Sequence, residues 1–218
     1  MKEKIKKEAL LYLGYKSNTP DEKTSADLDK CIDEIISLKS AKYIYSVFDI
    51  EHKEGILKLK DTNLTLASND IVNHLKTSKK VAILCVTLGS QIDFLINKYN
   101  KTNLSYAVLF DGAATAYAEH ICDIAQDEIS KKASEENFKI TPRFSPGYGD
   151  FDIKIQSEIV KITNAQKFIN LTVTKESMLI PTKSVTSLIG FTYDDIQSCE
   201  NKCAKCNMNK NCKFKREI

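Results

Sequence analysis

The sequence has no long apolar segment and very little net charge. Its apolar runs stop short of the roughly 18–20 residues that span a bilayer. The N-terminal segment 1–15 interrupts its apolar residues with charged ones, as an amphipathic helix does and a signal peptide does not. A net charge of +3 gives no general argument for nucleic-acid binding. We therefore expect a cytoplasmic protein that binds neither membrane nor nucleic acid.

Histidine is also scarce, with three residues in 218. His52, His74 and His120 are scattered, and none forms a visible pair with an aspartate or a nucleophile in the pattern of a catalytic triad. Each is therefore interpreted as a structural or surface residue.

The apolar patterns that are present predict helices and strands in mixed order. Residues 2–13 have a helical apolar face that ends at Gly14, and Thr19-Pro20-Asp21-Glu22 resembles a capping box that opens a helix to about Leu38. Ser68 is expected to cap a short helix. The longest helical pattern covers 104–136, and the small residues around Gly112 predict that another element packs closely against it.

Strands are expected at 43–48, 56–59, 81–87, 171–174 and 184–191, and the apolar run 81–87 is typical of a strand buried on both faces. The predicted fold class is α+β.

Two of the seven glycines and one of the four prolines fall within RFSPGYGD, residues 143–150. Glycines permit positive φ and let a ligand approach the backbone. Arg143 offers a planar fork for a carboxylate or phosphate, and Tyr148 offers a ring face for a flat heterocycle. The alternative interpretation is a tight Pro-Gly turn with a solvated arginine, and spacing alone favours it.

The long helical pattern carries a polar stripe. Asp111, Thr115 and Glu119 recur every four residues, which places them on one side of a helix. A solvated face explains such a stripe equally well. If it faces the glycine loop, it supplies a carboxylate for a cationic or hydroxyl-bearing ligand.

Cysteine is unevenly distributed. Cys31, Cys85 and Cys122 stand alone in apolar or helical segments and are interpreted as buried thiols. The other four, Cys199, Cys203, Cys206 and Cys212, form a C-x3-C-x2-C-x5-C pattern in a tail with six Lys/Arg and two Glu. In a reducing compartment this pattern predicts a four-thiolate zinc or [4Fe–4S] site, with iron–sulfur favoured. Free or redox-labile thiols are the alternative.

Five segments resemble, in order, the activation domain of cobalamin-dependent methionine synthase, in particular its short free-standing relatives. They are ALLYLGY (9–15), VTLGS (86–90), DGAATAYAE (111–119), RFSPGYGDF (143–151) and MLIPTKSVTSLIG (178–190). The resemblance implies an α+β fold with a twisted, mainly antiparallel sheet flanked by helices. The predicted organisation is an activation-domain-like domain at 1–194 and a Cys-rich basic tail at 195–218.

In this family the Arg-x-x-Pro-Gly-Tyr loop holds S-adenosylmethionine. By position, the resemblance implicates Arg143, Ser145, Gly147 and Tyr148, with Glu119 as the helix carboxylate and Thr115 as its alternative. The chain departs from full-length synthases after the loop: it has Gly149–Asp152 where they have a Cys-Pro-Asp-His segment, and Leu188 or Ile189 replaces an aromatic residue.

The implied function is reductive methylation of cob(II)alamin carried by a partner. The segments that bind homocysteine, folate and cobalamin are not recognisable, so any methyltransferase activity would be incomplete without that partner. The expected partners are a methionine synthase or another corrinoid protein and a flavodoxin- or ferredoxin-type reductant. The alternatives are a non-catalytic corrinoid-protein partner, or an iron–sulfur electron-transfer module that has lost S-adenosylmethionine binding.

Overall fold

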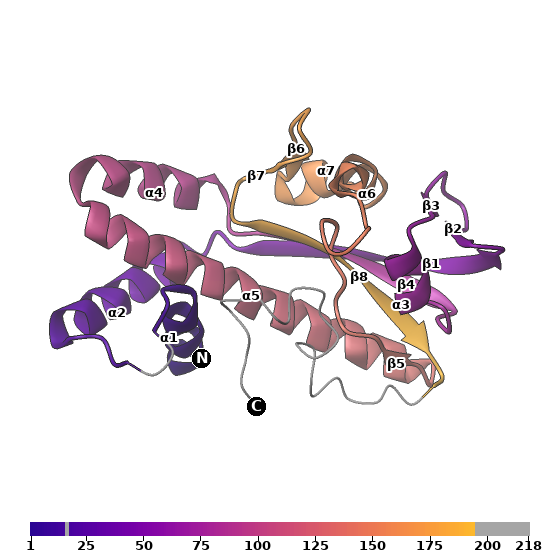
Figure 1. The fold of residues 1–218 in the computed structure, drawn as a ribbon, viewed down its shortest axis with the longest axis horizontal. Helices are drawn as coiled ribbons and strands as arrows, with labels where there is room; N and C mark the ends of the chain where they lie inside the picture. Colours follow the sequence, from indigo (N-terminus) through magenta and orange to yellow (C-terminus); the bar gives the residue numbers. More distant parts are fainter. Residues whose placement is uncertain (16–17, 195–218) are drawn as a thin grey trace.

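The computed structural model describes residues 1–15 and 18–194. At its centre lies an antiparallel sheet of six strands in the order β3-β2-β1-β4-β8-β5 (Figure 1). A separate hairpin pairs β6 with β7. The bounds are β1 (Lys42–Lys53), β2 (Ile56–Leu59), β3 (Thr65–Leu66), β4 (Lys80–Thr87), β5 (Lys139–Ile140), β6 (Thr172–Val173), β7 (Leu179–Ile180) and β8 (Ser184–Thr192).

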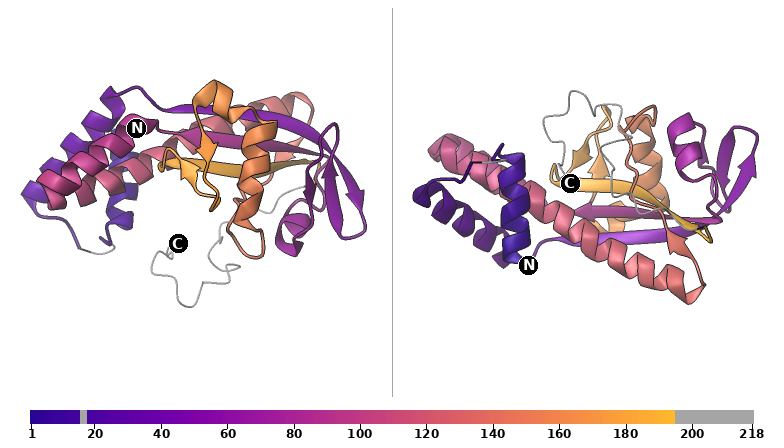
Figure 2. Two further views of the ribbon diagram at one scale, coloured as in Figure 1. Left: turned by 90° about the horizontal axis from the view of Figure 1, so that it is seen from above. Right: turned by 60° about the horizontal axis from the view of Figure 1, so that its bottom comes forward.

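Helices cover both faces of the sheet, which confirms the expected α+β class. The long helix α5 runs along one face with α1 and α2 beside it, and α6 and α7 lie on the other face (Figures 1 and 2). The bounds are α1 (Lys2–Tyr12), α2 (Glu22–Ser37), α3 (Asn69–His74), α4 (Ser90–Thr102), α5 (Leu104–Glu135), α6 (Gln156–Ile162), α7 (Ala165–Ile169) and the 3₁₀ turn η1 (Ile153–Ile155).

Strand β4 separates two apolar cores. Ala82, Leu84 and Val86 face the core formed with α1, α2 and α5. The intervening residues 81, 83 and 85 face the second core, formed with α3, α6 and α7. Because successive side chains of a strand point to opposite faces, a strand buried on both sides has the continuous apolar run that the sequence shows.

The close approach predicted at Gly112 is made by α1. A Cβ atom at Gly112 would lie 3.0 Å from the Leu13 side chain. The C-terminus of α1 is fixed by a Schellman motif at Gly14, whose φ is +90°: Tyr15 N–H donates to Leu10 O and Gly14 N–H to Leu11 O. The glycine therefore turns the chain so that Leu13 meets α5.

One local prediction about helix capping was wrong, and another was confirmed only in position. Helix α2 begins at Glu22, and its N-cap is Asp21, whose side chain accepts the Thr24 N–H, so Thr19 forms no capping box. Ser68 occupies the N-cap position of α3 but makes no side-chain capping bond.

None of the helices within the described residues is both long and apolar enough to cross a membrane. The tail 195–218, with its predicted domain boundary and its four cysteines, lies outside those residues.

Candidate functional site

Arg143 and Glu119, predicted from different segments, are in contact. The guanidinium Nη2 of Arg143 donates to Glu119 Oε2 at 3.0 Å. Its Nη1 donates to Asp123 Oδ1 at 3.0 Å and to Gln126 Oε1 at 3.2 Å. The glycine loop therefore lies against the polar stripe of α5, and the arginine is not simply solvated.

This cluster is half-buried and electrically balanced. Lys4 of α1 donates to Asp123 Oδ2 at 2.8 Å, so two cations face two carboxylates. Burial acts to raise the pKa of Asp123, but hydrogen bonds from Lys4 and Arg143 prevail and hold it below its usual value. Burial likewise acts to lower the pKa of Arg143, and the surrounding negative groups prevail and raise it. Both side chains therefore remain charged at neutral pH.

A third cation lies farther along the same stripe. Lys183, from the segment between β7 and β8, donates to Thr115 Oγ1 at 2.8 Å and approaches Asp111 Oδ1 at 2.9 Å. Its side chain is 17% exposed. Both loop segments that carry the family-like motifs thus meet one side of α5.

The glycine loop forms a tight turn anchored on the sheet. Phe144 exchanges two backbone hydrogen bonds with Leu188 of β8, at 3.0 and 2.8 Å. Gly147 N–H donates to Phe151 O at 2.7 Å, and Tyr148 N–H donates to Ser145 O at 3.2 Å. The amide groups of Gly147 and Tyr148 are therefore used within the turn, and a ligand along this loop would have to bind other groups.

Gly147 faces open space. Its φ is +93°, and no other atom lies within 4 Å of the position that a Cβ would occupy. The neighbouring Tyr148 is 64% exposed. The turn therefore presents bare backbone and an aromatic ring to the outside, close in sequence to the half-buried Arg143.

Sequence reasoning missed four of the contacting residues. Asp123 continues the stripe of α5 by one more step of four residues, so the same periodicity would have identified it. Gln126, Lys4 and Lys183 have no such signal, because their positions depend on the tertiary packing.

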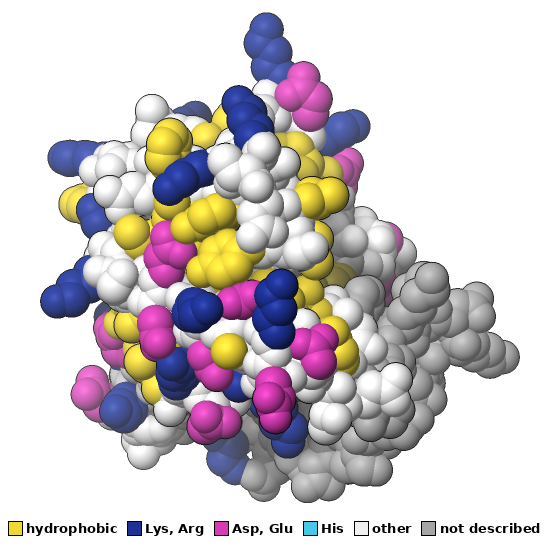
Figure 3. Space-filling model, turned by 90° about the vertical axis from the view of Figure 1, so that its left-hand side faces the viewer, with side chains coloured by type: hydrophobic (Ala, Val, Ile, Leu, Met, Phe, Trp, Pro, Cys, Tyr) yellow, Lys and Arg dark blue, Asp and Glu magenta, His cyan; other side chains and the backbone are white. Residues whose placement is uncertain are grey.

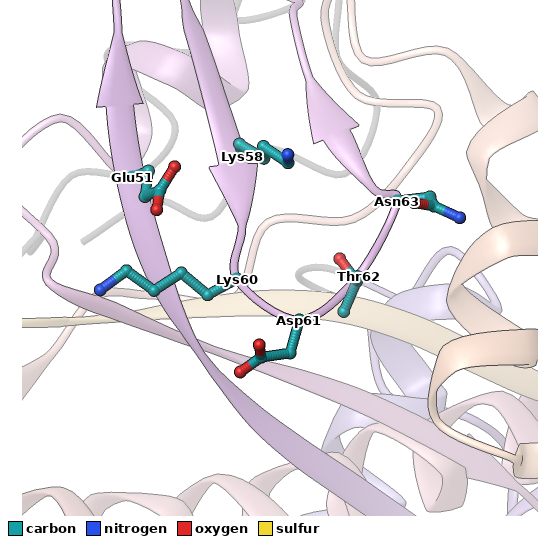
Figure 4. A pocket seen from close by; sticks show the side chains of 6 residues that line it. All are labelled: Glu51, Lys58, Lys60, Asp61, Thr62 and Asn63. Atoms are coloured by element: carbon teal, nitrogen blue, oxygen red, sulfur yellow. The ribbon is translucent and has the colours of Figure 1, made fainter.

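Two hollows of the surface within the described residues lie away from the glycine loop. One of about 460 Å³ lies at the β1–β2 hairpin and the turn to β3 (Figure 4); its polar lining is Glu51, Lys58, Lys60, Asp61, Thr62 and Asn63. Another of about 380 Å³ lies between α1, α4 and α5 and includes Asp111 and Thr115. Side chains of both charges are mixed with apolar ones on the end of the molecule shown in Figure 3. We base the site on the arginine cluster, because there charged groups from separate elements converge.

The isolated cysteines are buried, and His52 and His74 contact backbone carbonyl groups, as structural residues do. Cys31, Cys85 and Cys122 are buried, as expected. His52 Nε2 lies 2.7 Å from Ser78 O, and His74 Nε2 lies 2.9 Å from Pro142 O. Within the described residues no group of three or more His, Cys, Asp or Glu side chains is arranged to hold a metal ion.

Comparison with known proteins agrees with this picture. The family model described as the activation domain of vitamin B12 dependent methionine synthase matches residues 33–215. The chain belongs to this family. A sequence comparison with curated proteins found no significant match.

Among solved structures, the chain is similar to the MetH reactivation domain bound to AdoHcy. The TM-score is 0.68 at 11% sequence identity, and the match covers 90% of this chain and 76% of that one. At this identity the likeness establishes the fold. The activation-domain family therefore has the mainly antiparallel sheet flanked by helices that the resemblance implied.

Proposed function

We propose that this protein binds S-adenosylmethionine between the loop 143–148 and α5, and that it supports reductive methylation of cob(II)alamin on a partner corrinoid protein. The observation that carries the proposal is the 3.0 Å contact between Arg143 and Glu119. An α-amino acid bears a carboxylate and an ammonium group, so a neighbouring cation and anion on the protein match both of its charges. The relative bound to AdoHcy supports the same ligand class, because AdoHcy is what remains after the methyl group has left.

The residues present fit this ligand. Arg143 would bind the carboxylate, with Glu119 at the ammonium group, and the open side of Gly147 leaves room for the nucleoside near the Tyr148 ring. S-adenosylmethionine supplies a methyl cation to cobalt that has gained one electron from a reductant, and S-adenosylhomocysteine leaves. The contribution of this chain is to hold and orient the ligand, so no side chain has to transfer a proton.

The proposed partners follow from this chemistry. Cobalamin must come with a partner, a methionine synthase or another corrinoid protein, and the electron with a flavodoxin- or ferredoxin-type reductant. Both the corrinoid partner and the reductant would function in a reducing cytoplasm. We further propose that Cys199, Cys203, Cys206 and Cys212 hold an iron–sulfur cluster or zinc, because four thiolates at this spacing satisfy either centre.

A second function is favoured by the occupancy of Arg143. Its guanidinium already donates to Glu119, Asp123 and Gln126, and a ligand carboxylate has to compete with these acceptors. A protein that has kept the fold as a non-catalytic corrinoid-protein partner, or as an electron-transfer module, would have such a self-paired site.

Isothermal titration with S-adenosylmethionine separates the two functions. We expect the wild type to bind, and Arg143→Ala to weaken binding by about tenfold to a hundredfold, as the loss of charge-assisted hydrogen bonds would. Lys161→Ala, an exposed cation on α6, is the matched control and should bind as the wild type does. Absence of heat with the wild type at millimolar ligand would exclude the first function and favour the second.

Turnover is tested separately. With a corrinoid protein and a reductant supplied, the visible spectrum should convert from cob(II)alamin to methylcobalamin only when this chain and S-adenosylmethionine are both present. A rate that is unchanged when this chain is omitted would contradict the proposed role.

A further inference from the structure

The short helix α3 contacts both ends of the glycine loop. At its N-terminus, the Asp150 carboxylate accepts the backbone N–H groups of Asn69 and Asp70, at 2.8 and 3.0 Å. In return, Asp70 Oδ2 accepts the backbone N–H of Asp150 at 3.1 Å. These reciprocal bonds join segments 80 residues apart in sequence, and they supply the helix capping that Ser68 does not.

Gly149 is required by this contact. A Cβ at residue 149 would lie 1.8 Å from Asp70 Oδ2, well inside any real approach, and the φ of Gly149 is +56°. By contrast, a Cβ at Gly147 would meet no atom within 4 Å. The two glycines of the loop therefore have different roles: Gly149 admits the Asp70 carboxylate, and Gly147 leaves the outer side of the turn open.

The other end of α3 holds the start of the loop. His74 Nε2 lies 2.9 Å from the carbonyl oxygen of Pro142, the residue before Arg143, so the neutral tautomer with a proton on Nε2 donates to it. The His74 ring also packs on Phe144, with 5.0 Å between ring centroids. The loop is thus attached to α3 immediately before Arg143 and again immediately after Tyr148 and Gly149.

We infer that α3 is the positioning element of the proposed binding loop, and that the Asp70–Asp150 pair fixes the backbone between Arg143 and Asp150 in the shape that a ligand meets. Asp70 is then a positioning residue that does not itself touch the ligand. The inference rests on the proposed function for the identity of the ligand. Its structural content, a loop whose shape is maintained by α3, does not depend on that identity.

The test measures amide hydrogen exchange of peptides that cover residues 142–152, together with titration of S-adenosylmethionine, in the full-length protein. In Asp70→Ala we expect loop exchange to be faster by about tenfold, and the dissociation constant to rise by about tenfold, as when a hydrogen bond to a charged group is lost. Asp70→Asn keeps an acceptor oxygen and should restore most of the slow loop exchange and most of the affinity for S-adenosylmethionine. Asn73→Ala, at an exposed position of the same helix, is the matched control and should leave both unchanged.

A double substitution makes the test specific for the contact. Gly149→Ala should also speed loop exchange, and the effect of combining it with Asp70→Ala should be smaller than the sum of the two single effects, because the clash with Asp70 disappears and only the strain of the positive φ remains. Additive effects would overturn the inference. Loop exchange in Asp70→Ala equal to that of the wild type would overturn it as well.

The outcomes also separate this inference from the proposed function. If the wild type binds no S-adenosylmethionine but the loop exchanges faster in Asp70→Ala, the ligand assignment fails and the positioning role of α3 stands. If the wild type binds and Asp70→Ala binds equally well with an unaltered loop, the positioning role fails and the function stands.

Discussion

At the scale of residues, four charged side chains determine the net charge of the proposed site. Lys4 and Arg143 carry two positive charges, and Glu119 and Asp123 carry two negative ones, so the four side chains are neutral as a set. The amino-acid portion of S-adenosylmethionine, one ammonium and one carboxylate group, is also neutral as a set, so the site could exchange one internal ion pair for two pairs with these groups without leaving a charge of either partner unpaired. Such an exchange avoids the cost of an isolated half-buried charge. The site therefore suits a zwitterion better than a simple anion.

His74 gives the loop a pH dependence. Burial lowers the pKa of His74, and its hydrogen bond to Pro142 O only partly opposes this. Because the folded-state pKa lies below the unfolded value of about 6.5, the neutral form stabilises the fold above that pH, and the stabilisation is lost as pH falls through the folded-state pKa. We expect urea unfolding midpoints to fall between about pH 7.5 and pH 5, and to fall less in His74→Gln. An equal decrease in both proteins would contradict this role for His74.

At the scale of elements, α5 organises the molecule. One side of it carries small residues against α1, α2 and the sheet, and the next side carries the polar stripe that meets Arg143 and Lys183. A helix of 32 residues is about 48 Å long, so the sheet, the N-terminal helices and both loop segments can contact one rigid support. The small side chains of α5 let α1 pack closely against it. This packing brings Lys4 of α1 within hydrogen-bond distance of Asp123.

Gly112 tests that close approach. A Cβ there would lie 3.0 Å from Leu13, and the two further methyl groups of valine leave α1 no space at its present distance. We expect Gly112→Val to lower the free energy of unfolding by about 1–3 kcal/mol, as overpacking does. Asp127→Val, at an exposed position of the same helix, should change it by about 0.5 kcal/mol or less. Chemical denaturation measures the free energy of unfolding of both variants. Equal changes in the two would show that α1 can move away from α5 without loss of stability.

At the scale of the whole molecule, the described residues already form both apolar cores. The buried core residues extend from Ile5 to Phe191. Burial of apolar surface is the main stabilising contribution in folding. We therefore propose a domain boundary near residue 195, after the last buried residues of these cores.

Truncation after residue 194 tests this division. We expect residues 1–194 to keep the thermal midpoint and the affinity for S-adenosylmethionine of the full chain, and to lose bound metal. Anaerobically purified full-length protein should be brown with absorbance near 400 nm if the tail holds iron–sulfur, and colourless with bound zinc if it holds zinc. A full-length protein that contains neither metal would leave the cysteines as free thiols and contradict the metal site. A truncated chain that fails to fold would contradict the boundary.

The sequence by itself determined the features that local patterns encode. The apolar run of β4, the long pattern of α5 and the glycine after α1 follow from side-chain periodicity and backbone freedom, so their positions could be predicted. The ordered motifs also indicated the family and the residues Arg143 and Glu119. Only the tertiary structure decided which groups meet: Arg143 with Asp123 and Gln126, Lys183 with Asp111, and Asp150 with α3. These contacts join elements that are distant in sequence, and their geometry depends on how whole helices pack. No local sequence pattern specifies how these helices pack.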